Sequence, residues 1–241
     1  MKAATALALA ALTWTACASP EKNMTDDVTT EAGGAHATHG GHADHAEHGA
    51  HEHRFVDPSK YAERWNDPAR DEWQKPAELV GLMGIEPGMT VADLGAGTGY
   101  MLPHLSAAVG PEGEVLALDV EDAMIAYIEE NLAAYGPNVR AVKVPSDSPG
   151  VEPGSLDRLV TINTWHHVAG REAYAAKVLE ALKPGGRFVV VEFTLDSPIG
   201  APKEMRVDSA SVAADLKAGG FDASVAEETM PNHHVVIGVK R

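Results

Sequence analysis

The sequence predicts an α/β fold with a mainly parallel β-sheet and helices on both of its faces. The first observation is that short apolar runs alternate with stretches whose apolar residues recur at helical spacing, from residue 76 almost to the end of the chain. The second is a glycine-rich turn, residues 95–99, that joins the first apolar run to the helical stretch after it. Alternating strands and helices form parallel sheets with right-handed crossovers, so both observations indicate one fold class.

The segment that leads into this sheet is expected to be helical. Residues 65–76 are amphipathic, and Pro76 suits an early position in a helix. The apolar face of that helix consists of Leu79, Val80, Leu82 and Met83, and the stop signals after it are Gly84 and Pro87-Gly88.

The later elements follow from the same two patterns. Apolar runs predict strands at 91–94, 115–118, 139–144, 156–163, 182–191, 221–226 and 235–239. Helical spacing predicts helices over 101–109, 124–132, 174–182 and 209–219, with Gly136-Pro137 as a break.

The glycine turn reads Gly95-Ala96-Gly97-Thr98-Gly99-Tyr100. Glycine lets the backbone adopt positive φ and approach a ligand closely, because no Cβ stands in the way. A dinucleotide-binding turn would have its third glycine where Tyr100 stands, and Asp93 before the turn is foreign to that pattern.

Asp93 and the glycine turn resemble the first motif of class I S-adenosylmethionine-dependent methyltransferases, of the small-molecule type 11 or type 25 kind. Four more segments match that family in order, at 114–119, 144–147, 156–163 and 182–191. The resemblance implies a Rossmann-like domain with a mainly parallel seven-stranded sheet and an antiparallel strand near one edge. The alternative is a doubly wound domain that binds another nucleotide.

The resemblance also implies S-adenosylmethionine as cofactor and a small-molecule methyl acceptor. In such enzymes the acid at Asp119 would accept hydrogen bonds from two ribose hydroxyls, and Asp147 would contact the adenine amine. Ligands of open parallel sheets bind beyond the carboxyl ends of the strands. The expected cofactor-binding residues are Asp93, Gly95, Ala96, Gly97, Gly99, Tyr100, Asp119, Val120, Asp147 and Asn163.

Histidines supply the candidates for proton transfer. His166 and His167 follow the fourth predicted strand, where a neutral imidazole could accept a proton from the acceptor, or could instead pack under the loop. His104 is expected to be structural, and His233 and His234, placed just before the last strand, are expected to be surface or structural residues. Four residues of the lead-in could cover the cofactor as a lid or pack into the core: Tyr61, Trp65, Trp73 and Gln74.

Composition excludes some partners. The formal net charge is −16, and no run of basic residues occurs, so a nucleic-acid partner is not expected. Cys17 is the single cysteine, so the sequence provides no internal disulfide and no thiolate metal site in the folded part.

The N-terminus predicts export. Residues 1–17 read as a signal peptide, because a short basic start precedes an apolar run too short to span a bilayer. Thr15-Ala16-Cys17 resembles a bacterial lipoprotein box, which implies lipidation of Cys17 and membrane attachment on the periplasmic side of the cell envelope. Ordinary cleavage at Ala16-Cys17-Ala18, giving a secreted protein, is the alternative, as is an uncleaved start.

Residues 18–54 are predicted to be a disordered linker before a methyltransferase domain at 55–241, because they hold almost no large apolar side chains. Histidine recurs there at His36, His39, His42, His45, His48, His51 and His53. Several imidazoles could bind Zn²⁺ or Ni²⁺, and an inert tether is the alternative. The sequence therefore predicts an exported, membrane-anchored methyltransferase, or else a non-catalytic envelope protein that keeps the fold and binds metal through this tract.

Overall fold

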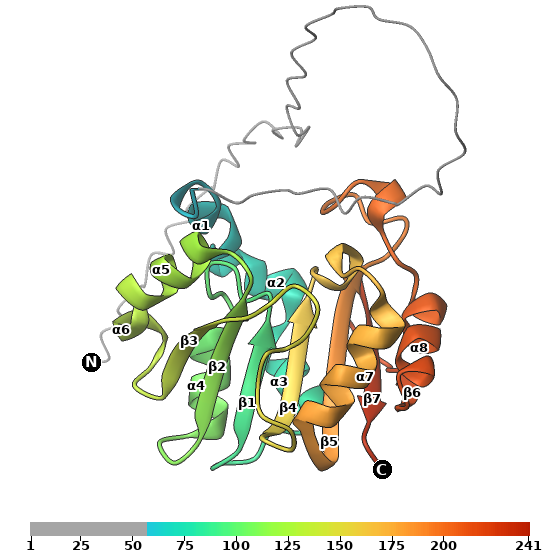
Figure 1. Cartoon of the computed structure of the whole chain (residues 1–241). Helices are drawn as coiled ribbons and strands as arrows, with labels where there is room; N and C mark the ends of the chain where they lie inside the picture. Colours follow the sequence, from blue (N-terminus) through green and yellow to red (C-terminus); the bar gives the residue numbers. More distant parts are fainter. Residues whose placement is uncertain (1–56) are drawn as a thin grey trace, which may run out of the picture. The chain divides into compact units, whose positions relative to one another are not determined.

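The computed structural model describes residues 57–241 (Figure 1). The predictions for the signal peptide, Cys17 and the histidine tract concern residues 1–56 and lie outside this range. A seven-stranded sheet forms the centre of the domain, in the order β3-β2-β1-β4-β5-β7-β6. The strand β7 is antiparallel to both of its neighbours, and the other pairs are parallel. The predicted fold class is confirmed.

The lead-in is broken into short helices. These are α1 (Ser59–Trp65), η1 (Pro68–Arg70), α2 (Asp71–Gln74) and α3 (Pro76–Met83). Asp67 caps η1 by accepting a hydrogen bond from the Ala69 amide at 2.9 Å. Pro76 is the first residue of α3, where a proline lacks only an N–H that would have no helical partner. The amphipathic pattern of residues 65–76 therefore predicted helical structure, and the caps and prolines divide it.

The strands are β1 (Thr90–Leu94), β2 (Glu114–Asp119), β3 (Val139–Lys143), β4 (Leu156–Ile162), β5 (Leu182–Phe193), β6 (Asp222–Val225) and β7 (His233–Val239). Leu94 at the end of β1 is in register with Leu118 of β2 and Thr161 of β4. The carboxyl ends of the central strands thus meet at one edge, at the top of Figure 1. Because β7 runs the other way, its first residue pairs with the last residue of β5 at that same edge.

The remaining helices are α4 (Leu102–Val109), α5 (Asp122–Glu130), α6 (Leu132–Tyr135), η2 (Trp165–His167), α7 (Arg171–Ala181), η3 (Lys203–Met205) and α8 (Ser209–Ala218). They cover both faces of the sheet, as predicted (Figure 1). One apolar core joins Leu79, Leu105 and Ile128 of α3, α4 and α5 to the sheet. The other joins Val178 of α7 and Leu216 of α8 to the opposite face. No helix of the described residues is long and apolar enough to cross a membrane.

Several predicted boundaries are wrong by one to three residues. The helix α5 begins at Asp122 rather than at Met124, α7 begins at Arg171 rather than at Tyr174, and two strands are longer than predicted. β5 continues to Phe193, two residues beyond its predicted end, and β7 begins at His233 rather than at Val235. Both extensions occur where the two strands pair, from Glu192 opposite His234 to Phe193 opposite His233. Charged and imidazole side chains obscure the apolar pattern there, so pairing rather than composition fixes the ends.

Candidate active site

The glycine turn is held against the ends of the neighbouring strands. Gly95, Gly97 and Gly99 adopt positive φ of 74°, 56° and 84°. The Gly95 amide donates to the Leu118 carbonyl at 2.8 Å. A Cβ on Gly95 would lie 2.5 Å from Cγ2 of Thr164, in the segment after β4. The first glycine is thus required both by its φ and by the close approach of another loop.

Asp119 lies at the end of β2, beside this turn. Its Oδ2 accepts a hydrogen bond from the Gly97 amide at 2.9 Å, and its Oδ1 accepts one from the Glu121 amide at 3.0 Å. The side chain is buried, and this burial raises the pKa of Asp119 against the opposing effect of those bonds. Val120, the next residue, is 45% exposed, which is unusual for a large apolar side chain in this domain. A carboxylate beside an exposed apolar side chain would suit a nucleoside, with Asp119 accepting hydrogen bonds from a ribose and Val120 packing against a base.

Asp93, in β1, is a second buried acid at this edge. Burial raises its pKa to about 7, and the charge of Asp119 acts in the same direction. The Arg70 guanidinium opposes both effects. A carboxyl group in this state gains most from a ligand that brings a positive charge.

Arg70 is a residue that the sequence did not single out. Its guanidinium lies 3.9 Å from the centre of the Tyr100 ring and donates to the Trp65 carbonyl at 2.9 Å. Desolvation lowers the pKa of Arg70 to about 10, and its Nε has no hydrogen-bond partner although it is buried. A single arginine in a mixed helical lead-in gives no sequence signal for this placement, because it depends on how η1 docks on the turn.

The lead-in lies against the glycine turn, and its role as a lid over the cofactor stays a prediction. Tyr61 and Trp65 stack with ring centroids 4.8 Å apart, and the Trp65 ring lies 3.4 Å from where a Cβ on Gly97 would be. Asn66 and Thr98 are joined by two hydrogen bonds of 2.7 Å. Tyr100, expected at the cofactor, donates its hydroxyl to Asp71 at 2.7 Å and so fastens the lead-in as well.

Trp73 and Gln74 have the alternative role, in packing. The Trp73 ring stacks on His233 at 5.7 Å with an interplanar angle of 2°, and Gln74 is fully buried. His233 lies in β7 and not before it, is 2% exposed, and has two ring nitrogens without a partner. Of the two expected roles, surface or structural, the burial of His233 supports the structural one. Burial lowers the pKa of His233 to about 3. His104 lies on α4 with its ring tilted over Tyr100 at 5.7 Å.

Asp147 lies in the loop after β3. Its carboxylate forms an ion pair with Lys177 of α7 at 2.7 Å, and 74% of the side chain is exposed. Lys177 holds the pKa of Asp147 below its usual value. This ion pair neither supports nor opposes the predicted contact of Asp147 with an adenine amine, which stays a prediction.

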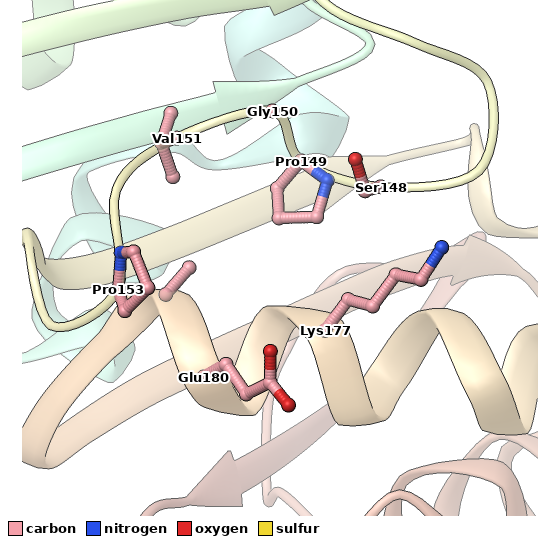
Figure 2. A pocket seen from close by; sticks show the side chains of 8 residues that line it. Ser148, Pro149, Gly150, Val151, Pro153, Lys177 and Glu180 are labelled. Carbon is pink, nitrogen blue, oxygen red and sulfur yellow. The ribbon is translucent and has the colours of Figure 1, made fainter.

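A shallow cavity of about 270 Å³ lies next to this ion pair, between residues 148–153 and α7 (Figure 2). Lys177 and Glu180 line it, together with Pro149 and Pro153. The Gly154 amide bonds the Glu180 carbonyl at 2.9 Å, so the loop approaches the end of α7, away from the glycine turn. We assign the chemistry to the carboxyl ends of the central strands, where the buried acids Asp93 and Asp119 lie, and not to this cavity.

The two candidate histidines form η2, directly after β4. Nδ1 of His166 lies 2.8 Å from Oε2 of Glu192, and 3% of the His166 side chain is exposed. The His166 and His167 ring centroids are 4.1 Å apart. Asn163, before η2, has a positive φ of 54° and a buried Oδ1 without a partner. A strained residue with an unused acceptor at a strand end is typical of a ligand site.

Glu192 is the second residue that the sequence did not single out. Its only sequence signal is a charge after the apolar run Phe188–Val191, and its contact with His166 depends on the β4–β5 pairing. The structure thus brings together Asp93, the glycine turn, Asp119, Val120, Asn163, His166 and His167 at one edge. Among the described residues no group of three or more His, Cys, Asp or Glu side chains could hold a metal ion.

Comparison with known proteins agrees with this geometry. Residues 91–186 match the family model of a methyltransferase domain. A ubiquinone/menaquinone biosynthesis C-methyltransferase of Idiomarina loihiensis is 32% identical over 120 residues, which are 49% of this chain and 47% of that protein. The protein of the same description from Salmonella paratyphi B is 30% identical over 146 residues, 60% of this chain and 57% of that one. The chain spans about half the length of the curated relatives it matches.

The fold comparison extends over more of the chain. The crystal structure of a SAM dependent methyltransferase from Aquifex aeolicus is 26% identical and has a TM-score of 0.70. The match covers 77% of this chain and 99% of that one. Residues 91–186 are therefore similar to a methyltransferase domain, and the described residues have the Rossmann-like fold of a solved SAM dependent methyltransferase.

Proposed function

We propose that this protein transfers a methyl group from S-adenosylmethionine to a small-molecule acceptor. The observation that supports this most is the glycine turn bonded to Asp119 and packed against Thr164, with the buried Asp93 beside it. When bound, the cofactor supplies a methyl group on a positively charged sulfonium, so the protein needs chiefly to orient two reactants.

The residues divide this task. Asp119 would accept hydrogen bonds from the ribose hydroxyls with the lone pairs that the two backbone amides leave free, and Val120 would pack on the base. Asp93 would face the positive charge of the cofactor, and Tyr61 and Trp65 would exclude water above the glycine turn. His166 and His167 would stand on the acceptor side, after β4.

The names of the relatives suggest one acceptor class. Both are described as acting in the biosynthesis of ubiquinone and menaquinone, by methylation at carbon. We take a hydroxylated ring on a lipid-soluble molecule as the first acceptor to test on this chain.

Labelled methyl transfer tests the proposal. The full chain would be incubated with methyl-labelled S-adenosylmethionine and a chemically reduced lipid extract of bacterial membranes, with Asp119→Asn as the matched control. We expect label in an organic-soluble product with the wild type and a strongly reduced amount with the variant. Cofactor binding without label in any product would instead favour the second candidate, an envelope binding protein that keeps the fold.

We also propose that the protein is exported and held on the membrane through lipid on Cys17. A basic start, an apolar run and one cysteine at its end support this. Wild type should fractionate with membranes and begin at Cys17 by mass, and Cys17→Ala should not. A soluble wild type that begins at Ser19 would indicate ordinary secretion.

The histidine tract is proposed to bind divalent metal ions independently of the domain. A peptide of residues 34–54 should take up Zn²⁺ or Ni²⁺ at neutral pH and release it near pH 5, because imidazoles bind metals only when neutral. A peptide that takes up no metal in a pH-dependent way at micromolar Zn²⁺ or Ni²⁺ would leave the inert tether as the better reading.

A further inference from the structure

Glu192 and His166 form a buried pair with two contacts. Oε1 of Glu192 accepts the backbone N–H of His166 at 3.1 Å, and Oε2 lies 2.8 Å from the Nδ1 of the same residue. The side chains are 1% and 3% exposed. A buried carboxylate needs such partners, and here one residue supplies both.

The second contact sets the position of the imidazole proton. An ionised carboxylate can only accept, so Nδ1 must hold a proton, and Nε2 of the neutral ring is left with a lone pair. Nε2 lies across the ring from Glu192. Among the described residues, ring nitrogens of His233 and His234 are buried without a hydrogen-bond partner, whereas neither ring nitrogen of His166 is.

The pair stands beside the glycine turn. Thr164, two residues before His166, is the residue that a Cβ on Gly95 would strike. The other groups that face the pair are His167, whose ring centroid is 4.1 Å from that of His166, and His234, which is paired with Glu192 across β5 and β7. Burial lowers the pKa of His234, which keeps it neutral, and Glu192 and Asp208 oppose that effect.

We propose that Glu192 is a positioning residue that presents Nε2 of His166 as the general base for the methyl acceptor. This rests on the proposed function. The acceptor atom forms its bond to the methyl carbon, the bond from that carbon to sulfur breaks with its electron pair left on sulfur, and the acceptor proton passes to Nε2. Glu192 stabilises the resulting imidazolium. The acceptor then belongs to the molecules that must lose a proton on methylation, such as a phenol or an enol, at oxygen or at the adjacent carbon.

Glu192→Gln tests this sharply. The backbone N–H of His166 can only donate, so it must keep the single amide oxygen of the glutamine. The amide nitrogen then faces Nδ1 and donates to it, which moves the ring proton to Nε2. A near-isosteric change that leaves both contacts hydrogen-bonded should thus remove the base, whereas a merely structural pair would tolerate it.

The first measurement is the ¹⁵N histidine spectrum of the full chain, recorded without ligand and with S-adenosylhomocysteine, which distinguishes the two tautomers. We expect His166 to be protonated at Nδ1 in the wild type and at Nε2 in Glu192→Gln, and to be unchanged in the exposed control Glu130→Gln. Wild-type His166 protonated at Nε2 or at both nitrogens near neutral pH would overturn the proposal, whether or not the variant folds.

The second measurement is methyl transfer to the reduced lipid extract. Glu192→Gln should lower kcat by about 100- to 10,000-fold, the usual range for a general base, and change the affinity for S-adenosylhomocysteine less than about twofold. His166→Asn keeps an N–H donor toward Glu192 but no base, and should do the same. Wild-type kcat in Glu192→Gln would overturn the proposal. A wild type that binds no cofactor would contradict the proposed function instead, because the tautomer of His166 is also measured in the protein without ligand.

Discussion

Asp119→Asn offers the most informative test of how the cofactor site is built. The Asp119 carboxylate accepts the amides of Gly97 and Glu121, one on each oxygen. Asparagine keeps one acceptor and places an amide nitrogen against the other N–H, so one buried donor loses its partner at a cost of about 1–3 kcal/mol. Since burial raises the pKa of Asp119, neutralising it offsets part of that cost, and we expect a loss of stability near the lower end.

The loss of cofactor affinity should be larger. The variant loses a charged acceptor for two hydroxyls, which corresponds to about 2–4 kcal/mol, or roughly 30- to 1,000-fold in Kd. Isothermal titration with S-adenosylhomocysteine measures the affinity, and urea unfolding measures the stability. Asp122→Asn is the matched control, because Asp122 is 81% exposed and its carboxylate pairs with Lys143 rather than with the amides that Asp119 binds. A folded Asp119→Asn that binds as tightly as wild type would refute the assignment of this acid.

Three further outcomes follow from the geometry. Burial raises the pKa of Asp93 to about 7, above the value of about 3.9 in unfolded chains, so the folded state binds the extra proton and stability should fall as the pH rises from about 4 to 7. Asp93→Asn should flatten that fall in urea titrations at several pH values, and an unchanged slope would assign the fall to other groups. Gly95→Ala should destabilise more than Gly154→Ala, because both glycines have positive φ but only the first would strike a neighbour, and equal losses in thermal unfolding would discount the Thr164 contact. The Arg206 guanidinium donates hydrogen bonds to the carbonyls of Thr194, Leu195, Ser197, Ile199 and Ala201. Arg206→Lys should therefore speed proteolysis of the β5–η3 loop while β5 stays protected, and wild-type cleavage rates in the variant would show that the loop does not need these bonds.

The sequence predicted the central strands well because they are buried on both faces of the sheet. Runs such as Val91–Leu94 and Phe188–Val191 are buried against helices on each side, so composition alone marks them. The glycine turn and Asp119 were equally predictable, because positive φ and a strand-end acid each have a local signature.

Other site residues could not be found in this way. Glu192 contacts His166 across 26 residues of sequence and only through the register of β4 and β5. Arg70 reaches the glycine turn because η1 docks there, held by the Asn66–Thr98 and Tyr100–Asp71 bonds. The sequence predicted the start of β7 two residues too late, because His233 is buried between Trp73 and Phe193 and a histidine gives no apolar signal for such burial. These contacts are properties of tertiary packing, and neither spacing nor composition encodes them.

The central claim is that this chain binds S-adenosylmethionine at the glycine turn. Isothermal titration of the full protein with S-adenosylmethionine, S-adenosylhomocysteine, ATP and NAD tests it most directly. We expect one site per chain for the first two ligands, weakened by Asp119→Asn, and no heat of binding from ATP or NAD. A folded protein that binds neither adenosyl ligand, or binds ATP or NAD more tightly, would contradict the claim.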